Sequence, residues 1–211
     1  LTNGGTGYSH QKATAAAIRK ELAEQASRLP LVHKRKPGLA VILVGSDPAS
    51  QTYVRNKQRA CNEVGILAEL HQLPPDTTQD QLLALIDTLN GRADVDGILL
   101  QLPLPNGLES RACLERILPD KDVDGFHPDN MGRLILGLPG LQPCTPAGVM
   151  ELLRRYNLSP AGKRAVVLGR SNIVGKPLSI MLSAPGKYAN ATVTVCHSGT
   201  KETRDICREA D

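Results

Sequence analysis

The sequence predicts an α/β fold that is made of two αβ domains. Short apolar runs typical of buried strands alternate with amphipathic stretches typical of helices, and this alternation indicates parallel βαβ units. The alternation starts twice, near residue 39 and again near residue 163, and a chain of 211 residues is long enough for two small domains. We therefore expect one domain over residues 1–145 and a second domain over residues 146–211.

The elements of the first domain are expected in a regular order. Strands are expected at residues 39–45, 66–73 and 97–101. Helices are expected at residues 10–29, 50–64, 78–91 and, with a weaker pattern, 108–117, with Ser50 as one N-cap and a capping box at 78–81 as another. Residues 1–9 are expected to be poorly ordered. Residues 119–140 are rich in Gly, Pro and Asp, and they predict a long, functional loop.

The second domain is expected to open with a helix whose N-cap is Thr145 and whose first helical residue is Pro146. The predicted buried stripe of this helix comprises Val149, Leu152, Leu153 and Tyr156. Strands are expected at residues 163–168 and 191–196, with a glycine-bearing turn and a helix between them. A second βαβ series therefore begins here, which is why the domain border is placed near Pro146.

The composition argues against several classes of protein. The net charge is +4, and the basic residues are scattered rather than clustered with aromatic residues, which argues against a nucleic-acid partner. The five cysteines form no C-x-x-C pair and the five histidines lie far apart, so we expect free thiols in a reducing compartment and no metal site. No apolar run reaches the length of a membrane span and no signal-peptide pattern precedes the first helix, so we expect a soluble, cytoplasmic protein.

Tyr53 and Lys57 are four residues apart on the helix that follows the first strand. They would share one face of this helix, close to the carboxyl end of a strand, where open α/β sheets bind ligands. The alternative is a tyrosine that packs on the aliphatic stem of a surface lysine, and the pair alone favours this alternative. Gln101 ends the third strand. It is either a core residue whose polar groups are hydrogen-bonded within the protein or a partner of Lys57, and Gln101 alone favours the core residue.

Two later segments carry further polar groups. In the segment 121–126, Asp122 is interpreted as turn chemistry, and Asp124 is the better ligand candidate if this loop folds over the face of Tyr53 and Lys57. The segment 143–146 lies where the domains join, and clefts between domains are favoured binding sites. Cys144 has no evident histidine partner, so it is not interpreted as a nucleophile.

Residues 165–177 have the pattern of a strand, a glycine-bearing turn and a helix. A turn of this kind directs main-chain N–H groups and a helix N-terminus at a phosphate. Gly169 and Gly175 are spaced more widely than the glycines of the usual dinucleotide fingerprint, so the spacing alone leaves an ordinary strand-to-helix turn equally open.

The next strand ends at His197 and Ser198, without the acidic residue that binds the ribose 2′-hydroxyl in NAD-selective folds. Arg170 and Ser198 could instead receive a 2′-phosphate, which favours NADP over NAD if a dinucleotide binds. The alternative for Ser198 is the N-cap of a helix that starts at Lys201, and His197 is interpreted as a strand-end residue.

Five motifs occur together in one order: Y-V-x-x-K at 53–57, Q-L-P-L-P at 101–105, K-D-V-D-G-F at 121–126, P-C-T-P at 143–146 and G-R-S-x-x-V-G-x-P at 169–177. In this order they resemble the methylenetetrahydrofolate dehydrogenase/cyclohydrolase (FolD) family, and the likeness spans residues 39–200. The resemblance implies NADP-dependent oxidation of 5,10-methylenetetrahydrofolate and hydrolysis of the methenyl product to 10-formyltetrahydrofolate, in one-carbon metabolism and purine biosynthesis. It also implies a parallel-sheet catalytic domain and a Rossmann-like NADP-binding domain with a cleft between them, usually in a homodimer.

The resemblance also implies residue roles. Lys57 would be the catalytic lysine, Tyr53 would stack on the folate, Gln101 would hold Lys57, and Asp124 would bind the amino edge of the pterin. The implied substrate site comprises Tyr53, Val54, Arg55, Asn56, Lys57, Leu100, Gln101, Leu102 and Asp124. The implied NADP site comprises Gly169, Arg170, Ser171 and Ser198.

The chain departs from the family pattern at both ends. Residues 1–12 do not look like the usual start of the family, and family members continue beyond the equivalent of Asp211 with further strands and a final helix. An incomplete nucleotide-binding domain is therefore expected. Two alternatives remain: a folate-binding fragment without dehydrogenase activity, and an NADP-dependent reductase that acts on another substrate. The set of Tyr53, Lys57, Gln101 and Asp124 argues against the second alternative.

Overall fold

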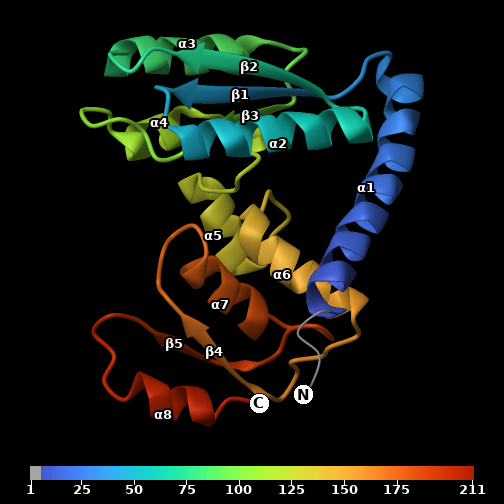
Figure 1. The fold of residues 1–211 in the computed structure, drawn as a ribbon, viewed down its shortest axis with the longest axis vertical. Helices are drawn as coiled ribbons and strands as arrows, with labels where there is room; N and C mark the ends of the chain where they lie inside the picture. The colour runs from blue at the N-terminus through green and yellow to red at the C-terminus, as the bar shows by residue number, and fades with distance from the viewer. Residues whose placement is uncertain (1–5) are drawn as a thin grey trace. The chain divides into compact units, whose positions relative to one another are not determined.

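The computed structural model describes residues 6–211, with side chains from residue 12 on, and it is drawn in Figure 1. The chain forms two compact units, one that ends at Ile117 and one that runs from Leu118 to Asp211. Each unit contains a parallel sheet with helices, which confirms the predicted α/β class. The expected border between residues 145 and 146 stays a prediction. The expectation for residues 1–5 lies outside the described residues.

The first unit is built on a three-stranded parallel sheet in the order β2-β1-β3. The strands are β1 (Gly38–Val44), β2 (Leu67–Leu73) and β3 (Gly97–Leu100), close to their predicted positions. The central strand β1 is buried from Ala40 to Val44, as its continuous apolar run predicts. Ile42 pairs with Leu100, so β1 and β3 end side by side at the carboxyl edge of the sheet.

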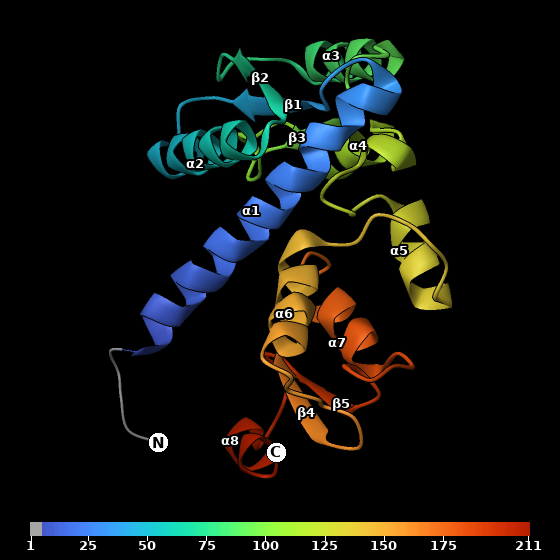
Figure 2. The same cartoon turned by 90° about the vertical axis from the view of Figure 1, so that its right-hand side faces the viewer.

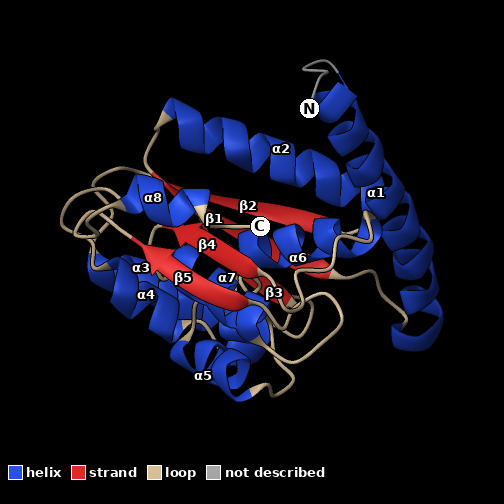
Figure 3. Ribbon diagram, turned by 90° about the horizontal axis from the view of Figure 1, so that it is seen from below, coloured by secondary structure: helices blue, strands red, loops and turns tan. Residues whose placement is uncertain are grey.

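Helices cover both faces of this sheet. Helix α2 (Pro48–Val64) lies on one face, whereas α3 (Gln79–Gly91) and α4 (Ser110–Arg116) lie on the other, as Figure 3 shows. The core beneath α3 and α4 is aliphatic and includes Ala40, Ile42, Val44, Leu82, Ile86 and Leu89. The alternation of side chains along β1 places its remaining buried residues on the side of α2. Strands β1 and β3 are thereby buried on both faces of the sheet.

The helix ends in this unit follow from local chemistry, with one correction. The capping box of α3 is present, because Thr78 and Gln81 each accept a hydrogen bond from the other's main-chain N–H. Gly65 ends α2 in the left-handed conformation. The prediction that Ser50 caps α2 was wrong: Asp47 is the N-cap, and its carboxylate accepts a hydrogen bond from the N–H of Ser50 at 2.7 Å.

Helix α1 (Thr6–His33) is longer than the predicted span of 10–29 and includes residues 6–9, which were expected to be poorly ordered. It packs against α2. Its leucines Leu22 and Leu29 are only partly buried, with 46% and 39% of their surface exposed. None of the helices within residues 6–211 is both long and apolar enough to cross a membrane.

The second unit contains a pair of parallel strands, β4 (Arg164–Leu168) and β5 (Thr192–Cys196), close to their predicted positions. Helix α7 (Gly175–Ser183) lies on one face of the pair and α8 (Thr203–Arg208) on the other, which Figures 1 and 2 show from two sides. Helix α6 (Cys144–Arg155) packs against α7. The expected second βαβ unit is therefore present.

The predicted long loop at 119–140 was wrong, because it contains a short 3₁₀ helix η1 (Pro119–Lys121) and the helix α5 (Pro128–Leu136). His127 caps α5 through its ring: Nδ1 accepts a hydrogen bond from the N–H of Asp129 at 3.1 Å. Gly137 ends the helix in the left-handed conformation.

Three smaller predictions in the second unit were also wrong. Thr145 does not cap α6, because the helix already begins at Cys144, and Pro146 lies in its first turn. Tyr156 lies beyond the end of α6 and is 44% exposed, so it is not part of a buried stripe. Ser198 does not cap a helix, because α8 begins only at Thr203.

Candidate active site

The carboxyl edge of the first sheet brings a lysine and a glutamine together. Lys57 lies on α2 with its side chain half-buried, and its Nζ donates a hydrogen bond of 3.3 Å to Oε1 of Gln101. Gln101 directly follows β3. Tyr53 lies one turn before Lys57 on α2, with its side chain exposed to 63%. An open aromatic face therefore lies next to a tethered ammonium group.

Gln101 is itself held on two sides. Its main-chain N–H donates to the carbonyl of Ile42 at 2.9 Å, which continues the pairing of β3 with β1. Its side-chain Nε2 donates to the carbonyl of Leu102 at 2.7 Å. Because the amide nitrogen has this partner, the amide oxygen faces Lys57. The buried sheet thus fixes the atom to which the ammonium binds.

Four of the remaining predicted substrate residues fall into two groups. Val54 and Leu100 are buried in the core at about 1–2% exposure, so only their main chain can meet a ligand. Arg55 and Asn56 are exposed on α2, and a guanidinium N–H of Arg55 donates to Oγ1 of Thr52 at 3.1 Å. The roles of these residues in substrate binding stay predictions.

Asp124 lies in the second unit, in a loop that two neighbours hold in place. Asp122 is buried, and its carbonyl accepts the N–H of Gly125 at 3.0 Å in a tight turn. Gly125 has φ +67°, and a Cβ at this position would lie 2.5 Å from the carbonyl carbon of Gln142. The segment 142–144 therefore packs directly on the loop. Asp124 is half-buried between these contacts.

The carboxyl ends of β4 and β5 form a second site. Leu168 pairs with Cys196, so the turn after β4 lies next to the turn at 197–200 after β5. Gly169 has φ +114°, and its N–H donates to the carbonyl of Cys196 at 2.7 Å. Only glycine adopts this conformation without strain. Arg170 and Ser198 are both exposed at this edge.

Gly175 allows α7 to start close to this turn. A Cβ at Gly175 would lie 2.2 Å from the carbonyl oxygen of Gly169, so no other residue fits. Gly169 and Gly175 thus supply a tight turn and a close helix–strand approach, two of the three tasks of glycines in dinucleotide-binding folds. Oγ of Ser171 accepts the N–H groups of Val174 and Gly175, which ties the turn to the start of α7.

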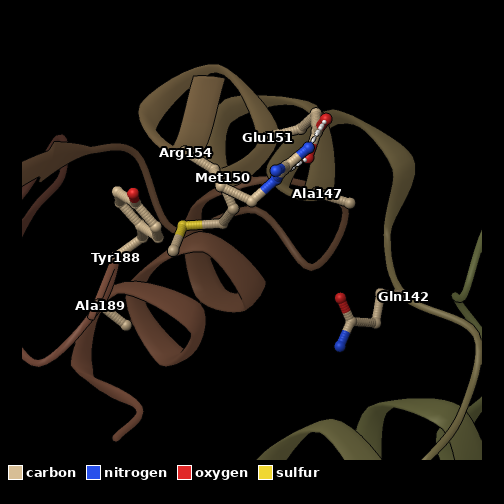
Figure 4. A pocket seen from close by; sticks show the side chains of 7 residues that line it. All are labelled: Gln142, Ala147, Met150, Glu151, Arg154, Tyr188 and Ala189. Carbon is tan, nitrogen blue, oxygen red and sulfur yellow. Dashed lines mark hydrogen bonds and ion pairs between the residues drawn. The ribbon is translucent and has the colours of Figure 1, made fainter. Parts of the chain in front are cut away.

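A third feature is a hollow of about 280 Å³ beside α6, drawn in Figure 4. Met150 and Tyr188 lie on one side of it, and Gln142 lies on the other. Glu151 lies at its edge in ion pairs with Arg154 and Arg155, and these hydrogen bonds lower the pKa of Glu151 to about 2. None of the predicted site residues lines this hollow.

Sequence reasoning missed Asp47 and Asn130, which hold the elements that carry the site. Asp47 fixes the start of α2, and the pattern Asp-Pro at 47–48 is a recognisable signal for an N-cap followed by a first helical proline. Asn130 is buried on α5 and binds Asp122. No local pattern marks it, because its partners Pro119 and Asp122 lie outside its own helix.

These features define a two-domain α/β enzyme that combines a lysine–glutamine pair with a glycine-bearing nucleotide turn. Residues 10–124 match the domain described as "Tetrahydrofolate dehydrogenase/cyclohydrolase, catalytic domain". Residues 143–211 match the domain described as "Tetrahydrofolate dehydrogenase/cyclohydrolase, NAD(P)-binding domain". The chain belongs to the tetrahydrofolate dehydrogenase/cyclohydrolase family.

Similar proteins agree with this assignment. The "Bifunctional protein FolD" of Nitratidesulfovibrio vulgaris (strain DSM 19637 / Miyazaki F) is 72% identical over 200 residues, which cover 95% of this chain and 69% of the relative. A crystal structure of the bifunctional enzyme FolD from Campylobacter jejuni is 50% identical with a TM-score of 0.90, over 95% of this chain and 70% of that one. The Trypanosoma brucei FolD structure, complexed with NADP cofactor and inhibitor, is 40% identical with a TM-score of 0.87, over 94% of this chain and 67% of that one.

Proposed function

We propose that this chain oxidises 5,10-methylenetetrahydrofolate with NADP⁺ and hydrolyses the methenyl product to 10-formyltetrahydrofolate. The observation that carries the proposal is the hydrogen bond between Lys57 and Gln101 beside the exposed ring of Tyr53. The matches to both family domains favour these two activities over a folate-binding chain without dehydrogenase activity.

The dehydrogenase step asks the protein chiefly for positioning. Nitrogen lone pairs of the methylene compound push out a hydride, and the cation that forms is delocalised, so no strong base is required. NADP⁺ supplies the hydride acceptor. The exposed ring of Tyr53 offers a face on which the folate stacks, and the loop of Asp124 binds the amino edge of the pterin. Holding the reacting groups in one orientation supplies much of the rate.

The cyclohydrolase step needs proton transfers as well. The oxygen of water bonds to the methenyl carbon, the bond from this carbon to N5 breaks, and N5 gains a proton. Water loses both of its protons, so one proton is released overall. Lys57 takes or relays protons through Nζ, and Oε1 of Gln101 holds this nitrogen in place. Lys57 lies on α2 and Gln101 directly follows the buried strand β3, so the sheet of the first unit positions both residues.

The second unit provides the residues that fit NADP. The main-chain N–H groups at residues 170–173 face the phosphates, since Gly175 has no side chain beside the turn. Arg170 and Ser198, both exposed at the strand ends, bind the 2′-phosphate of NADP through charge-assisted hydrogen bonds. Ser171 supports the turn, because its Oγ accepts the N–H groups of Val174 and Gly175.

The proposal extends to assembly and location. A homodimer is proposed from the resemblance to the family. A cytoplasmic location is proposed because no disulfide joins the five cysteines, all of which lie in the described part of the chain, and thiols persist in a reducing compartment. The product, 10-formyltetrahydrofolate, would serve purine biosynthesis.

An ultraviolet time course with 5,10-methylenetetrahydrofolate and NADP⁺ tests the function. We expect NADPH to appear without accumulation of the methenyl compound, because the second activity consumes it. Accumulation of the methenyl compound would contradict the cyclohydrolase assignment. If no NADPH forms, the dehydrogenase assignment fails.

The role of Lys57 is tested by Lys57→Met, which keeps the length of the side chain and removes the amine. We expect hydrolysis of supplied methenyltetrahydrofolate to fall about 10²- to 10⁴-fold, the usual contribution of a general acid or base. Lys36→Met removes an exposed lysine of the same unit and serves as the matched control. An unchanged hydrolysis rate in Lys57→Met would contradict the proposed role of Lys57 in proton transfer.

A further inference from the structure

A buried carboxylate lies beneath the loop that carries Asp124. The side chain of Asp122 is 2% exposed, and its Oδ2 accepts hydrogen bonds from the main-chain N–H of His127 at 2.8 Å and from Nδ2 of Asn130 at 2.9 Å. His127 is the N-cap residue of α5, so the negative charge lies where the helix dipole stabilises it. Because a buried carboxylate is costly without such partners, Asp122 is held in this one position.

Asn130 connects Asp122 with Pro119 through one side-chain nitrogen. Its side chain is 3% exposed, and the same Nδ2 also donates to the carbonyl of Pro119 at 2.8 Å. One amide group therefore ties α5 both to the start of η1 and to Asp122, which directly follows η1. Because one nitrogen makes both hydrogen bonds inside a buried environment, the amide has little freedom to move.

The same loop is fixed from its other side. Gly125 packs against the main chain of Gln142, and Sγ of Cys144 donates to the carbonyl of Val123 at 3.2 Å. Asp124 thus lies between two anchored residues, and the turn that carries it starts at Asp122. A change in the position of Asp122 is therefore passed on to the carboxylate of Asp124.

We propose that Asp122 and Asn130 are positioning residues for the folate substrate. They are too deeply buried to bind it themselves, and they hold the carboxylate of Asp124 in the orientation that the pterin requires. This inference rests on the proposed role of Asp124. The inference predicts an effect on folate binding and none on NADP binding, because the turn that begins at Gly169 shares none of these hydrogen bonds.

A double-mutant cycle tests this inference. Asn130→Asp keeps the shape of the side chain but sets a second carboxylate against Asp122. We expect the KM for 5,10-methylenetetrahydrofolate to rise about tenfold, with the Kd of NADP unchanged in calorimetry. In a chain that already carries Asp124→Asn, the same change should alter this KM by less than about twofold, because an effect that acts through Asp124 is lost with it. Asn157→Asp adds the same charge at an exposed asparagine of the second unit and is the control.

The outcomes are distinguishable. The inference would be overturned if Asn130→Asp raised the KM equally in the parent and in the chain with Asp124→Asn. It would also be overturned by a lower kcat with an unchanged KM, which is what partial unfolding produces. If Asn130→Asp does not fold, Asn130→Ala gives the same cycle, because Asp122 then keeps its bond to His127. If Asp124→Asn alone leaves the KM unchanged, the proposed role of Asp124 fails. If it raises the KM and neither change at Asn130 does, only the positioning inference fails.

Discussion

Helices α2 and α7 both follow the carboxyl end of a parallel strand, but different parts of the chain carry their proposed functions. On α2 the proposed functional atoms belong to side chains, with the ring of Tyr53 exposed and Nζ of Lys57 hydrogen-bonded to Gln101. At α7 the important contact is between main-chain atoms, because Gly175 brings the helix against Gly169. Proton transfer requires one titratable group with a fixed partner, whereas a phosphate requires N–H groups that any residue supplies once side chains are out of the way.

The largest expected effect comes from adding one methyl group at α7. Gly175→Ala places a Cβ 2.2 Å from the carbonyl oxygen of Gly169, so the turn must move. We expect dehydrogenase activity to fall about 10²-fold or more, because displacement of the cofactor misaligns the reacting atoms. Hydrolysis of methenyltetrahydrofolate should remain within about twofold, because Lys57 lies in the other unit. Gly148→Ala is the control, since a Cβ there meets nothing within 4 Å. Equal loss of both activities would contradict the comparison.

A smaller loss is expected when the partner of Lys57 is removed. Gln101→Leu keeps a similar volume and deletes the oxygen that accepts from Nζ. A hydrogen bond to a charged group is worth enough to predict a loss of about 10- to 100-fold in hydrolysis of methenyltetrahydrofolate. Gln72→Leu, at an exposed glutamine of β2, should change nothing. Normal hydrolysis by Gln101→Leu would show that Lys57 needs no fixed partner.

The N-terminus of α2 offers a milder change. Asp47→Ala removes the carboxylate that accepts from the N–H of Ser50, and this bond also lowers the pKa of Asp47. We expect the melting temperature to fall by about 2–4 °C, the usual effect of a lost N-cap in a chain of this size. Asp76→Ala changes an exposed aspartate in a turn of the same unit and is the control. An unchanged melting temperature would show that α2 does not depend on this cap.

The smallest expected effect concerns α6. Apart from the segment 143–146 at its start, this helix carries no predicted site residue. Because its two arginine partners lower the pKa of Glu151 from 4.5 to about 2, the pairs stabilise the fold above pH 4.5 and this contribution is lost as the pH falls towards 2. Glu151→Gln should flatten the pH dependence of unfolding in this window, by under about 1 kcal/mol for such a surface pair. Glu24→Gln, on α1, is the control. An identical slope in Glu151→Gln and the parent would refute the expectation.

Much of the fold could be predicted because buried strands and helix caps have recognisable patterns over a few consecutive residues. The run at 39–45 became β1 almost as predicted, and the capping box at 78–81 was found from four residues. Helix α5 was missed because its cap is a histidine ring rather than a serine, threonine, aspartate or asparagine. Pro128 at its first position and Gly137 after its end were the available signals.

The site was predictable only in pieces. Tyr53 and Lys57 lie on one helix, so their spacing predicts a shared face. Lys57 and Gln101 are separated by 44 residues, and only the parallel pairing of β1 and β3 brings them together. The bond of Asn130 to Asp122 has no pattern in the sequence, because an asparagine buried for its partners looks like any surface asparagine.

The exposed ring of Tyr53 also decides how the protein can be observed. The chain has no tryptophan, four tyrosines and one phenylalanine, so its near-ultraviolet circular dichroism arises chiefly from tyrosine. Tyr188, by contrast, is held by Asn157 through a hydrogen bond of 2.9 Å. A pterin stacked on Tyr53 would therefore change a spectrum with few contributors. Folate binding can be followed in this way in an unlabelled sample.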